Sequence, residues 1–383
     1  MPLPQIPLLN VRAQTASIRA EIDQAIARVL DHGQFILGPE VRQLEERIAE
    51  YCGTKFAIAC ASGTDAILLP LMALNIGPGD RVVVPPFTFF ATAGCVSRLG
   101  ATPVFVDIEY GTFNLDPVLL GRYLESLPPA DLATVKAIIP VHLFGQCADM
   151  PAINEIAGRF SIPVIEDAAQ AIGSEFSGAR AGSMGWCGTL SFFPSKNLGG
   201  IGDGGMVTTN DPSLDARLRL LRVHGSGATY FHDEVGTNSR LDTLQAAVLL
   251  AKLPHLEGWA VRRQENAAAY RDAFSRLLPE GALTAPIALP DATHVYNQFT
   301  IRVRQRDEVR RRLAEMNVAS AVYYPLPLHQ QKCFEPLGYR AGDFPVTETA
   351  ANEVLSLPID PELGPDSIET VVERLAVVLQ SLA

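Results

Sequence analysis

The sequence predicts an α/β protein in which a large domain with a mainly parallel sheet flanked by helices precedes a smaller α+β domain. At 383 residues the chain exceeds the usual size of one hydrophobic core. Short apolar runs alternate with helical segments between residues 56 and 209, which is typical of a doubly wound sheet. After Asp242 the pattern changes to a long helical stretch. We therefore expect the first domain, with an N-terminal arm, in residues 1–245 and the second in residues 246–383.

The elements follow from local patterns. Residues 11–30 have helical spacing and end at His32-Gly33, a natural C-cap, and Gly38-Pro39 then opens a second helix through about Tyr51. Buried strands are predicted at residues 56–60, 81–84, 104–106, 137–141, 163–166, 189–193 and 205–209. The second domain is predicted to contain a helical stretch 243–277 interrupted at Pro254, a strand 296–303, a helix 307–316, an aromatic-proline segment 321–329 and a last helix 366–382.

The charge pattern argues against nucleic acid and membranes as partners. The formal net charge of -11 is spread along the chain without a basic run, so phosphate-backbone tracking is not expected. The first residues lack a basic segment followed by an apolar stretch, and no apolar run reaches the ~18 residues of a membrane span. A cytoplasmic, soluble protein is expected.

The six cysteines are far apart and without histidines at ligand spacing, so reduced structural thiols are expected rather than a metal site.

Three features at the carboxyl ends of predicted strands carry the chemistry, because open α/β sheets bind ligands there. The first is residues 59–66 (Ala-Cys-Ala-Ser-Gly-Thr-Asp-Ala), a strand that runs into a small-residue turn and a helix. Backbone N–H groups at such a helix N-terminus attract anions, and Thr64 adds a hydroxyl. A phosphate seat is one interpretation, and a plain helix N-cap is the other.

The second feature is residues 164–170 (Val-Ile-Glu-Asp-Ala-Ala-Gln), a strand that ends in two carboxylates. An acid at this place can hold the protonated ring nitrogen of pyridoxal 5′-phosphate (PLP) and keep the ring an electron sink. Asp167 is the candidate. Glu166 points to the opposite side of the strand and is expected to be structural. A metal site is the alternative, but no matching acidic cluster is present to complete it.

The third feature is Lys196, which follows a buried strand and precedes a run of glycines. Burial among apolar and small residues lowers the pKa of a lysine and suits it to imine formation and proton transfer. The alternative is a solvated surface lysine. Together the three features predict a PLP pocket. His142, also at a strand end, is expected to be a satisfied core histidine.

These residues resemble the DegT/StrS-type sugar-nucleotide aminotransferases of PLP fold type I, from about Leu9 to the last helix. The segments that carry the resemblance are residues 33–39 (Gly-Gln-Phe-Ile-Leu-Gly-Pro), 62–66 (Ser-Gly-Thr-Asp-Ala), 86–89 (Pro-Phe-Thr-Phe), 166–170 (Glu-Asp-Ala-Ala-Gln), 191–196 (Ser-Phe-Phe-Pro-Ser-Lys) and 238–242 (Asn-Ser-Arg-Leu-Asp). The resemblance implies that Lys196 forms the Schiff base and shuttles the proton, and that Asp167 pairs with the ring nitrogen. It also implies that Gln170 binds the ring 3-hydroxyl, that Ala169 packs under the ring and that Phe89 stacks on its other face. A core aromatic is the alternative for Phe89.

By the same resemblance, Gly63, Thr64 and Ser191 hold the phosphate of the cofactor. Asn238 reaches the cofactor of the neighbouring subunit, so a homodimer with shared active sites is expected. Substrate contacts are expected from Arg240, Tyr323, Tyr324 and His329. The alternatives are a surface ion pair for Arg240 and plain packing for the two tyrosines.

The implied reaction moves an amino group from an amino acid, typically L-glutamate, to a keto sugar on a nucleoside diphosphate, for cell-surface polysaccharide or glycosylated metabolite biosynthesis. Residues 32–41, 145–149 and 238–245 look most like members that aminate C3 of 3-oxo sugars on UDP or dTDP, while C4 amination stays open. Glucuronate enzymes tend to carry a histidine where this chain has Tyr323, which argues against a uronic acid. Related dehydratases replace the Schiff-base lysine with histidine, and a non-catalytic regulator would be expected to lose Lys196 or Asp167. A dinucleotide-binding G-x-G-x-x-G is absent after the first strand.

Overall fold

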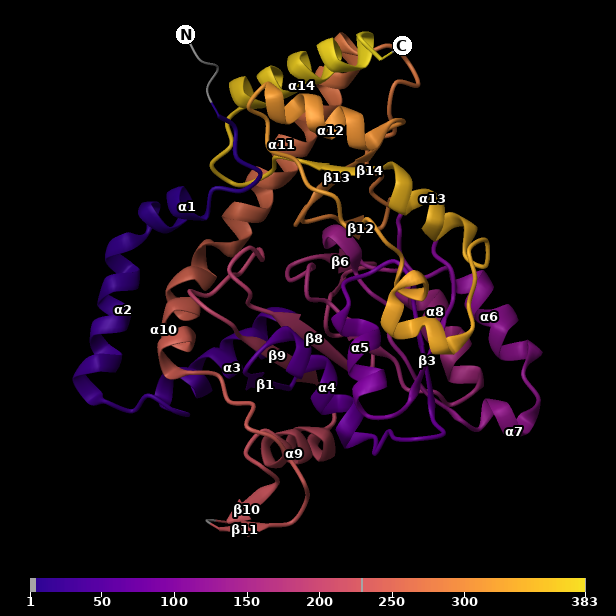
Figure 1. Cartoon of the computed structure of the whole chain (residues 1–383). Helices are drawn as coiled ribbons and strands as arrows, with labels where there is room; N and C mark the ends of the chain where they lie inside the picture. Colours follow the sequence, from indigo (N-terminus) through magenta and orange to yellow (C-terminus); the bar gives the residue numbers. More distant parts are fainter. Residues whose placement is uncertain (1–4, 229, 383) are drawn as a thin grey trace.

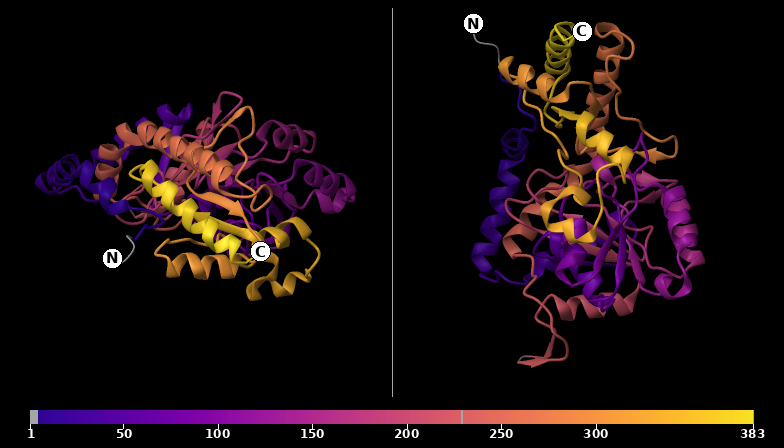
Figure 2. Two further views of the ribbon diagram at one scale, coloured as in Figure 1. Left: turned by 90° about the horizontal axis from the view of Figure 1, so that it is seen from above. Right: turned by 45° about the vertical axis from the view of Figure 1, so that its right-hand side comes forward.

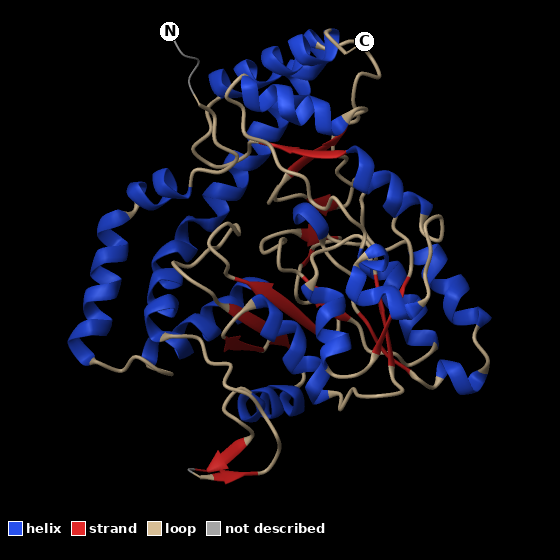
Figure 3. Ribbon diagram, viewed as in Figure 1, coloured by secondary structure: helices blue, strands red, loops and turns tan. Residues whose placement is uncertain are grey.

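The buried apolar runs form a central sheet that helices surround (Figures 1 and 3). The computed structural model describes residues 5–228 and 230–382. The strands of the sheet are β1 (Phe56–Cys60), β2 (Arg81–Val84), β3 (Thr102–Phe105), β4 (Val135–Ile138), β5 (Ile165–Asp167), β8 (Cys187–Ser191) and β9 (Gly205–Thr209). All of the strands predicted between residues 56 and 209 are present, with ends shifted by a few residues.

The strand order explains why the predicted site residues meet. One group runs β1-β9-β8-β5 and another β3-β2-β4, and parallel bridges from Ile138 to Val164 and from Val141 to Asp167 join the two groups. Only β9 runs antiparallel to its neighbours within these groups, β1 and β8. The mainly parallel sheet is confirmed, and the carboxyl ends of β1, β5 and β8 lie at one edge.

Helices surround this sheet, and most of them bury apolar side chains in its core. They are α3 (Pro39–Cys52), α4 (Gly63–Ala73), α5 (Ala91–Arg98), α6 (Pro117–Ser126), α7 (Pro129–Leu132), α8 (Met150–Arg159), α9 (Pro212–Leu221) and α10 (Thr243–Lys252). Helix α4 packs on β8 and β9 through buried residues such as Ile67 and Leu71. Each fully buried leucine or isoleucine contributes ~1.5–3 kcal/mol relative to an exposed one. This packing fixes the N-terminus of α4 at the site edge.

The N-terminal arm differs from the prediction of one helix over residues 11–30. It consists of α1 (Val11–Ser17) and α2 (Arg19–His32), separated at Ile18. Ile18 leaves the helical conformation, with φ -124° and ψ 23°, and its buried side chain packs with Val248 and Trp259. Tertiary packing therefore breaks the helix, while its predicted end at Gly33, with φ +69°, is confirmed.

A short hairpin was not predicted. It comprises β10 (Ser226–Ala228) and β11 (Phe231–His232) and protrudes from the body beside α9 (Figures 1 and 2). The remaining short strands are β6 (Glu175–Phe176), β7 (Ala179–Arg180) and β12 (Ala292–Thr293), and the 3-10 helices are η1 (Leu143–Gly145), η2 (Leu253–His255), η3 (Leu328–Gln330) and η4 (Lys332–Leu337).

The C-terminal part has its own apolar core. Helix α11 (Leu256–Leu277) follows the predicted interruption at Pro254, and α12 (Arg306–Glu315), α13 (Pro345–Glu353) and α14 (Pro365–Gln380) surround the antiparallel pair β13 (Phe299–Arg302) and β14 (Val354–Leu357). Tyr270 stacks on Phe299 in this core at 4.6 Å. The predicted strand 296–303 begins only at Phe299, because Tyr296 adopts φ +45°. Helix α13 and β14 were not anticipated.

Two core clusters accompany the predicted division of the chain. Helix α10 packs with α3 in the cluster of the large sheet, and α11 contributes Leu256 there and Ala267 to the C-terminal core. The boundary at residues 245 and 246 stays a prediction. All six cysteines are free thiols, five of them buried. Within the described ranges no helix has the length and apolarity that a membrane crossing requires.

Candidate active site

The first predicted feature forms a close junction between α4 and the end of β8. Ser62 caps the helix, accepting a hydrogen bond from Asp65 N at 3.1 Å, so the N-cap interpretation is correct for that residue. A Cβ on Gly63 would lie 2.6 Å from Ser191 Cβ, and therefore only glycine lets the two segments meet here. The Thr64 side chain remains exposed. The structure thus brings Gly63, Thr64 and Ser191 together at a positively polarised helix end.

Asp167 lies at the end of β5 and is almost fully buried. Its Oδ2 accepts a hydrogen bond from Thr92 Oγ1 at 2.8 Å, and its Oδ1 accepts one from Ala169 N at 3.2 Å. Burial raises the pKa of Asp167, whereas these two hydrogen bonds and the nearby Lys196 lower it. The two hydrogen bonds and Lys196 favour the charged form of this acid, against the larger effect of burial.

Lys196 lies in a tight turn after β8. Its backbone N donates to Phe193 O at 2.8 Å, and Gly200 N closes the turn on Phe192 O, also at 2.8 Å. Burial lowers the pKa of Lys196 to about 8, and the carboxylate of Asp167 partly opposes that shift. Lys196 is therefore not a freely solvated surface lysine, and it lies close enough to Asp167 for each to shift the pKa of the other.

Gln170 connects the site with the aromatic-proline segment. Its Oε1 accepts a hydrogen bond from Phe144 N at 2.7 Å, and its Nε2 donates to the hydroxyl of Tyr324 at 3.3 Å. The Tyr324 ring lies 6.4 Å from that of Phe89. Phe89 is 58% exposed, so it is not the core aromatic of the alternative interpretation. Tyr324 is accordingly close to the predicted cofactor residues, and burial raises its pKa.

The other predicted substrate residues are less closely connected with this group. Tyr323 makes an edge contact with the Tyr324 ring at 5.9 Å. Arg240 is half-buried and forms no ion pair with any described residue. His329 is buried against Phe344 and bonded through Nε2 to Glu348 Oε1 at 3.1 Å, and among the described residues it forms no hydrogen bond with Lys196 or Asp167. The structure thus does not bring His329 to the lysine.

Asn238 is exposed on a strand segment that lies against its own α4 turn. The adjacent Ser239 donates from Oγ to Asp65 Oδ2 at 2.8 Å and accepts from Ala61 N at 3.3 Å. The backbone at Asn238 is therefore fixed beside the predicted phosphate site, and its side chain is exposed.

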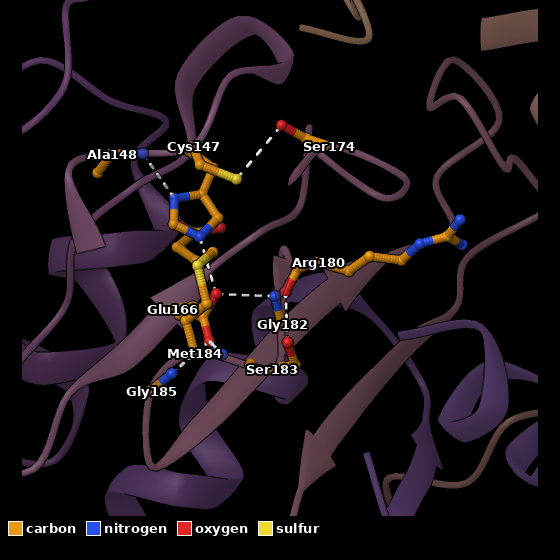
Figure 4. Close-up of polar contacts among 12 residues, drawn as sticks. Cys147, Ala148, Glu166, Ser174, Arg180, Gly182, Ser183, Met184 and Gly185 are labelled. Atoms are coloured by element: carbon orange, nitrogen blue, oxygen red, sulfur yellow. Dashed lines mark hydrogen bonds and ion pairs between the residues drawn. The ribbon is translucent and has the colours of Figure 1, made fainter. Parts of the chain in front are cut away.

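Glu166 precedes Asp167 on β5, is fully buried, and points toward the turn of Gly182, Met184 and Gly185 (Figure 4). Its Oε1 accepts from Met184 N and Gly185 N, both at 2.6 Å, and its Oε2 accepts from Gly182 N at 2.7 Å. His142 Nε2 lies 2.9 Å from the same Oε2, and Ala148 N donates to His142 Nδ1 at 3.1 Å. Since Nδ1 accepts, Nε2 carries the proton and donates to Glu166. Both residues are structural, as the sequence predicted.

Thr92 was not identified from the sequence. It lies on α5, 75 positions before Asp167, and no local pattern links the two. The one sequence feature that could have identified Thr92 as a site residue is its position three residues after the 86–89 motif. In the part of the chain that the structure describes, no group of three or more His, Cys, Asp or Glu side chains could hold a metal ion.

Comparison with known proteins decides the family. A family model described as the DegT/DnrJ/EryC1/StrS aminotransferase family matches residues 16–376. The chain belongs to this family. It is 46% identical over 376 residues to a UDP-N-acetyl-3-dehydro-alpha-D-glucosamine 3-aminotransferase of Acidithiobacillus ferrooxidans, covering 98% of this chain and 97% of the relative. It is also 47% identical over 374 residues to a "Pleiotropic regulatory protein" of Geobacillus stearothermophilus, covering 97% and 98% of the two chains.

Solved structures of this family agree with the fold. DesV of S. venezuelae, crystallised with a ketimine intermediate, matches with a TM-score of 0.93 at 42% identity, covering 98% of this chain and 99% of that one. NtdA of Bacillus subtilis, with bound cofactor PMP, matches with a TM-score of 0.90 at 33% identity, covering 99% and 86%. The predicted fold class, enzyme class and PLP-type cofactor are confirmed at the level of the family.

Proposed function

We propose that the protein is a PLP-dependent aminotransferase that moves an amino group from an amino acid, L-glutamate being the expected donor, to C3 of a 3-oxo sugar on a nucleoside diphosphate. The observation that carries the proposal is the proximity of Lys196, whose pKa burial lowers to about 8, to the buried Asp167 at the carboxyl edge of the sheet. High identity to an enzyme named for a 3-dehydro sugar nucleotide supports the choice of substrate class.

The residues present fit PLP. A phosphate would find the N-terminus of α4, the Thr64 hydroxyl and Ser191, at a junction that only Gly63 permits. The buried Asp167 would hold the ring nitrogen, and Gln170 would offer Nε2 to the ring 3-hydroxyl, since its Oε1 is already engaged by Phe144. When bound, PLP supplies an electron sink for the carbon that loses or gains the amino group.

The protein supplies position and proton transfer. Lys196 Nζ titrates close to neutral pH, so it can both accept and return a proton in one catalytic cycle. The hydrogen bonds from Thr92 and Ala169 favour the charged form of Asp167. Phe89 and Tyr324 present aromatic surface beside these groups and would limit the access of water. Arg240, Tyr323, Tyr324 and His329 remain proposed substrate contacts, although His329 is bonded to Glu348 in this conformation.

We propose that the active unit is a homodimer with shared sites. Phe35, Ile36 and Leu37 are three consecutive exposed apolar residues. The hairpin protrudes from the body (Figure 2), and Phe231 in it and Val235 just after it are 73% and 92% exposed. Such exposed apolar side chains favour a protein interface. Mixing a Lys196→Ala variant with an Asn238→Ala variant tests the sharing. Hybrid dimers regain activity if Asn238 serves the neighbouring site, and no recovery contradicts sharing.

A product assay tests the function itself. Purified protein with PLP, glutamate and a panel of 3-oxo and 4-oxo sugars on UDP and dTDP should yield an aminated 3-oxo sugar, and Lys196→Ala should yield none. If only the 4-oxo sugars are aminated, the proposed amination at C3 is wrong and the enzyme aminates C4. Absence of any product, with a regulatory effect retained in Lys196→Ala, would favour the regulator that the name of one relative raises.

A further inference from the structure

Residues 294–298 connect the C-terminal part of the protein with the turn that carries Lys196. We propose that Asn297 is a positioning residue for Lys196 and acts through Asn197. The inference rests on the proposed function, because it assigns a role in that same site.

Asn197 directly follows Lys196 and is held by two hydrogen bonds from its side chain. Its Nδ2 donates to Val295 O at 3.0 Å, and its Oδ1 accepts from Asn297 Nδ2 at 2.7 Å. Asn197 and Asn297 are only 4% and 7% exposed. Hydrogen bonds in such a dry place are electrostatically stronger than in water, so the pair restrains the residue next to the lysine.

The same segment also holds the opposite side of the site. Val295 N donates to Gly145 O at 2.8 Å, and Gln298 N donates to Phe144 O at 3.3 Å. Phe144 N in turn donates to Gln170 Oε1 at 2.7 Å. Residues 294–298 therefore fix the lysine turn relative to the turn that orients Gln170, and the two lie on different loops of the large domain.

Helix α11 secures the segment from behind. Arg263 Nη1 donates to Tyr296 O at 3.1 Å, and Gln264 Nε2 donates to His294 O at 3.2 Å. Arg271 Nη2 donates to the Tyr296 hydroxyl at 2.6 Å. Arg263 is itself 2% exposed, so this anchor is part of the packed interior. Because α11 anchors residues 294–298 independently of the turn that carries Lys196, the segment can hold that turn in one position.

Stability alone explains Asn297 poorly. Its Oδ1 is buried and has no hydrogen-bond partner among the described residues, which costs free energy that an apolar residue would not incur. Among the residues that the structure describes, its side chain forms one hydrogen bond, to Asn197. A misplacement of a reacting group by about 1 Å can cost up to ~100-fold in rate, so a residue that fixes the lysine turn has functional value.

The test compares Asn297→Ala with Asn266→Ala. Asn266 is a matched control, because it is equally buried and donates from Nδ2 to a backbone carbonyl, Asp360 O, at 2.8 Å, without contacting the lysine turn. The first readout is the rate at which protein stripped of cofactor captures added PLP in a borohydride-reducible, visibly absorbing form. The others are kcat, KM for the amino donor, and Tm.

We expect Asn297→Ala to slow capture and kcat about tenfold with KM for the amino donor within twofold of wild type, as expected for a slightly displaced reacting group. Both Asn297→Ala and Asn266→Ala should lower Tm, by similar amounts. Asn266→Ala should leave the rate of PLP capture unchanged. The double variant Asn197→Ala/Asn297→Ala should be no slower than Asn197→Ala alone, because both changes remove the same interaction.

Equal capture rates in wild type and Asn297→Ala, or equal slowing in Asn266→Ala, would overturn the inference. If Asn297→Ala does not fold, Asn297→Leu, whose side chain has the same number of heavy atoms branched at Cγ, provides the same comparison. A wild-type protein that captures no PLP would overturn the proposed function together with this inference. Normal capture in wild type and variant alike would overturn the inference alone.

Discussion

The hydroxyl of Thr92 donates a hydrogen bond to Oδ2 of Asp167 across 2.8 Å, and both side chains are buried. Burial raises the pKa of Asp167, and the hydrogen bond from Thr92 is the largest of the effects that lower it. In the proposed function Asp167 must stay ionised to hold a protonated ring nitrogen. Thr92 therefore helps to set the lowest pH at which the site can work.

Replacing Thr92 tests this relationship. In Thr92→Val the pKa of Asp167 rises further, because the charged form loses a donor. A hydrogen bond to a charged group is worth ~1.5–3 kcal/mol, or roughly one to two pKa units. The acid limb of the kcat profile should move to higher pH by that amount. Thr88→Val is the control, since Thr88 contacts Thr92 at 3.2 Å and not Asp167. Coincident acid limbs in wild type and Thr92→Val would contradict the assignment.

The lowered pKa of Lys196 predicts how PLP capture depends on pH. Only the neutral amine is a nucleophile, so the capture rate of protein without cofactor should rise with pH and level off above pH about 8. With an ordinary exposed lysine, the capture rate would continue to rise until about pH 10.4. Because Asp167 raises the pKa of Lys196, Asp167→Asn should move the midpoint to lower pH. A wild-type midpoint near pH 10 would show that the lysine is not desolvated.

The junction of Gly63 and Ser191 predicts a large effect from one methyl group. In Gly63→Ala the new Cβ would lie 2.6 Å from Ser191 Cβ, so the end of β8 and the start of α4 must separate. Such overpacking costs ~1–3 kcal/mol, and we expect PLP to bind roughly ten to a hundred times more weakly. Titration of the visible cofactor band measures this. A Cβ added at Gly258 on α11 would meet no atom within 4 Å, so Gly258→Ala should bind PLP like wild type. Equal PLP affinities of Gly63→Ala and Gly258→Ala would contradict the predicted phosphate site at the junction of Gly63 and Ser191.

Glu166 should contribute strongly to stability. An amide at this position offers one acceptor oxygen, whereas the carboxylate accepts from Gly182, Met184, Gly185 and His142. Glu166→Gln therefore leaves buried donors facing an NH₂ group and should cost about 3 kcal/mol. Glu175→Gln is the matched control, because its partner Arg180 is partly exposed and such pairs contribute ~0–1 kcal/mol. Thermal unfolding measures the stability of both variants. Equal losses of Tm in Glu166→Gln and Glu175→Gln would show that the hydrogen bonds of Glu166 contribute no more to stability than a partly exposed ion pair.

The sequence predicted elements whose residues satisfy a local periodicity. The strand from Phe56 to Cys60 and the helix from Pro39 to Cys52 match because side chains repeat every two residues in a strand and every 3.6 in a helix. The prediction failed at Ile18, which leaves the helix to pack against Trp259. No spacing in the first twenty residues encodes a contact between Ile18 and Trp259, which lie 241 positions apart.

The chemistry of the site divides in the same way. The sequence by itself determined the family and the candidates Lys196 and Asp167, because each lies in a contiguous motif at a strand end. Only the tertiary structure decided that Thr92 serves Asp167, that Asn297 holds Asn197 and that His329 lies apart from the lysine. The physical reason is that burial and hydrogen bonding between distant segments set the pKa and the position of a side chain, and neither is a property of its sequence neighbours.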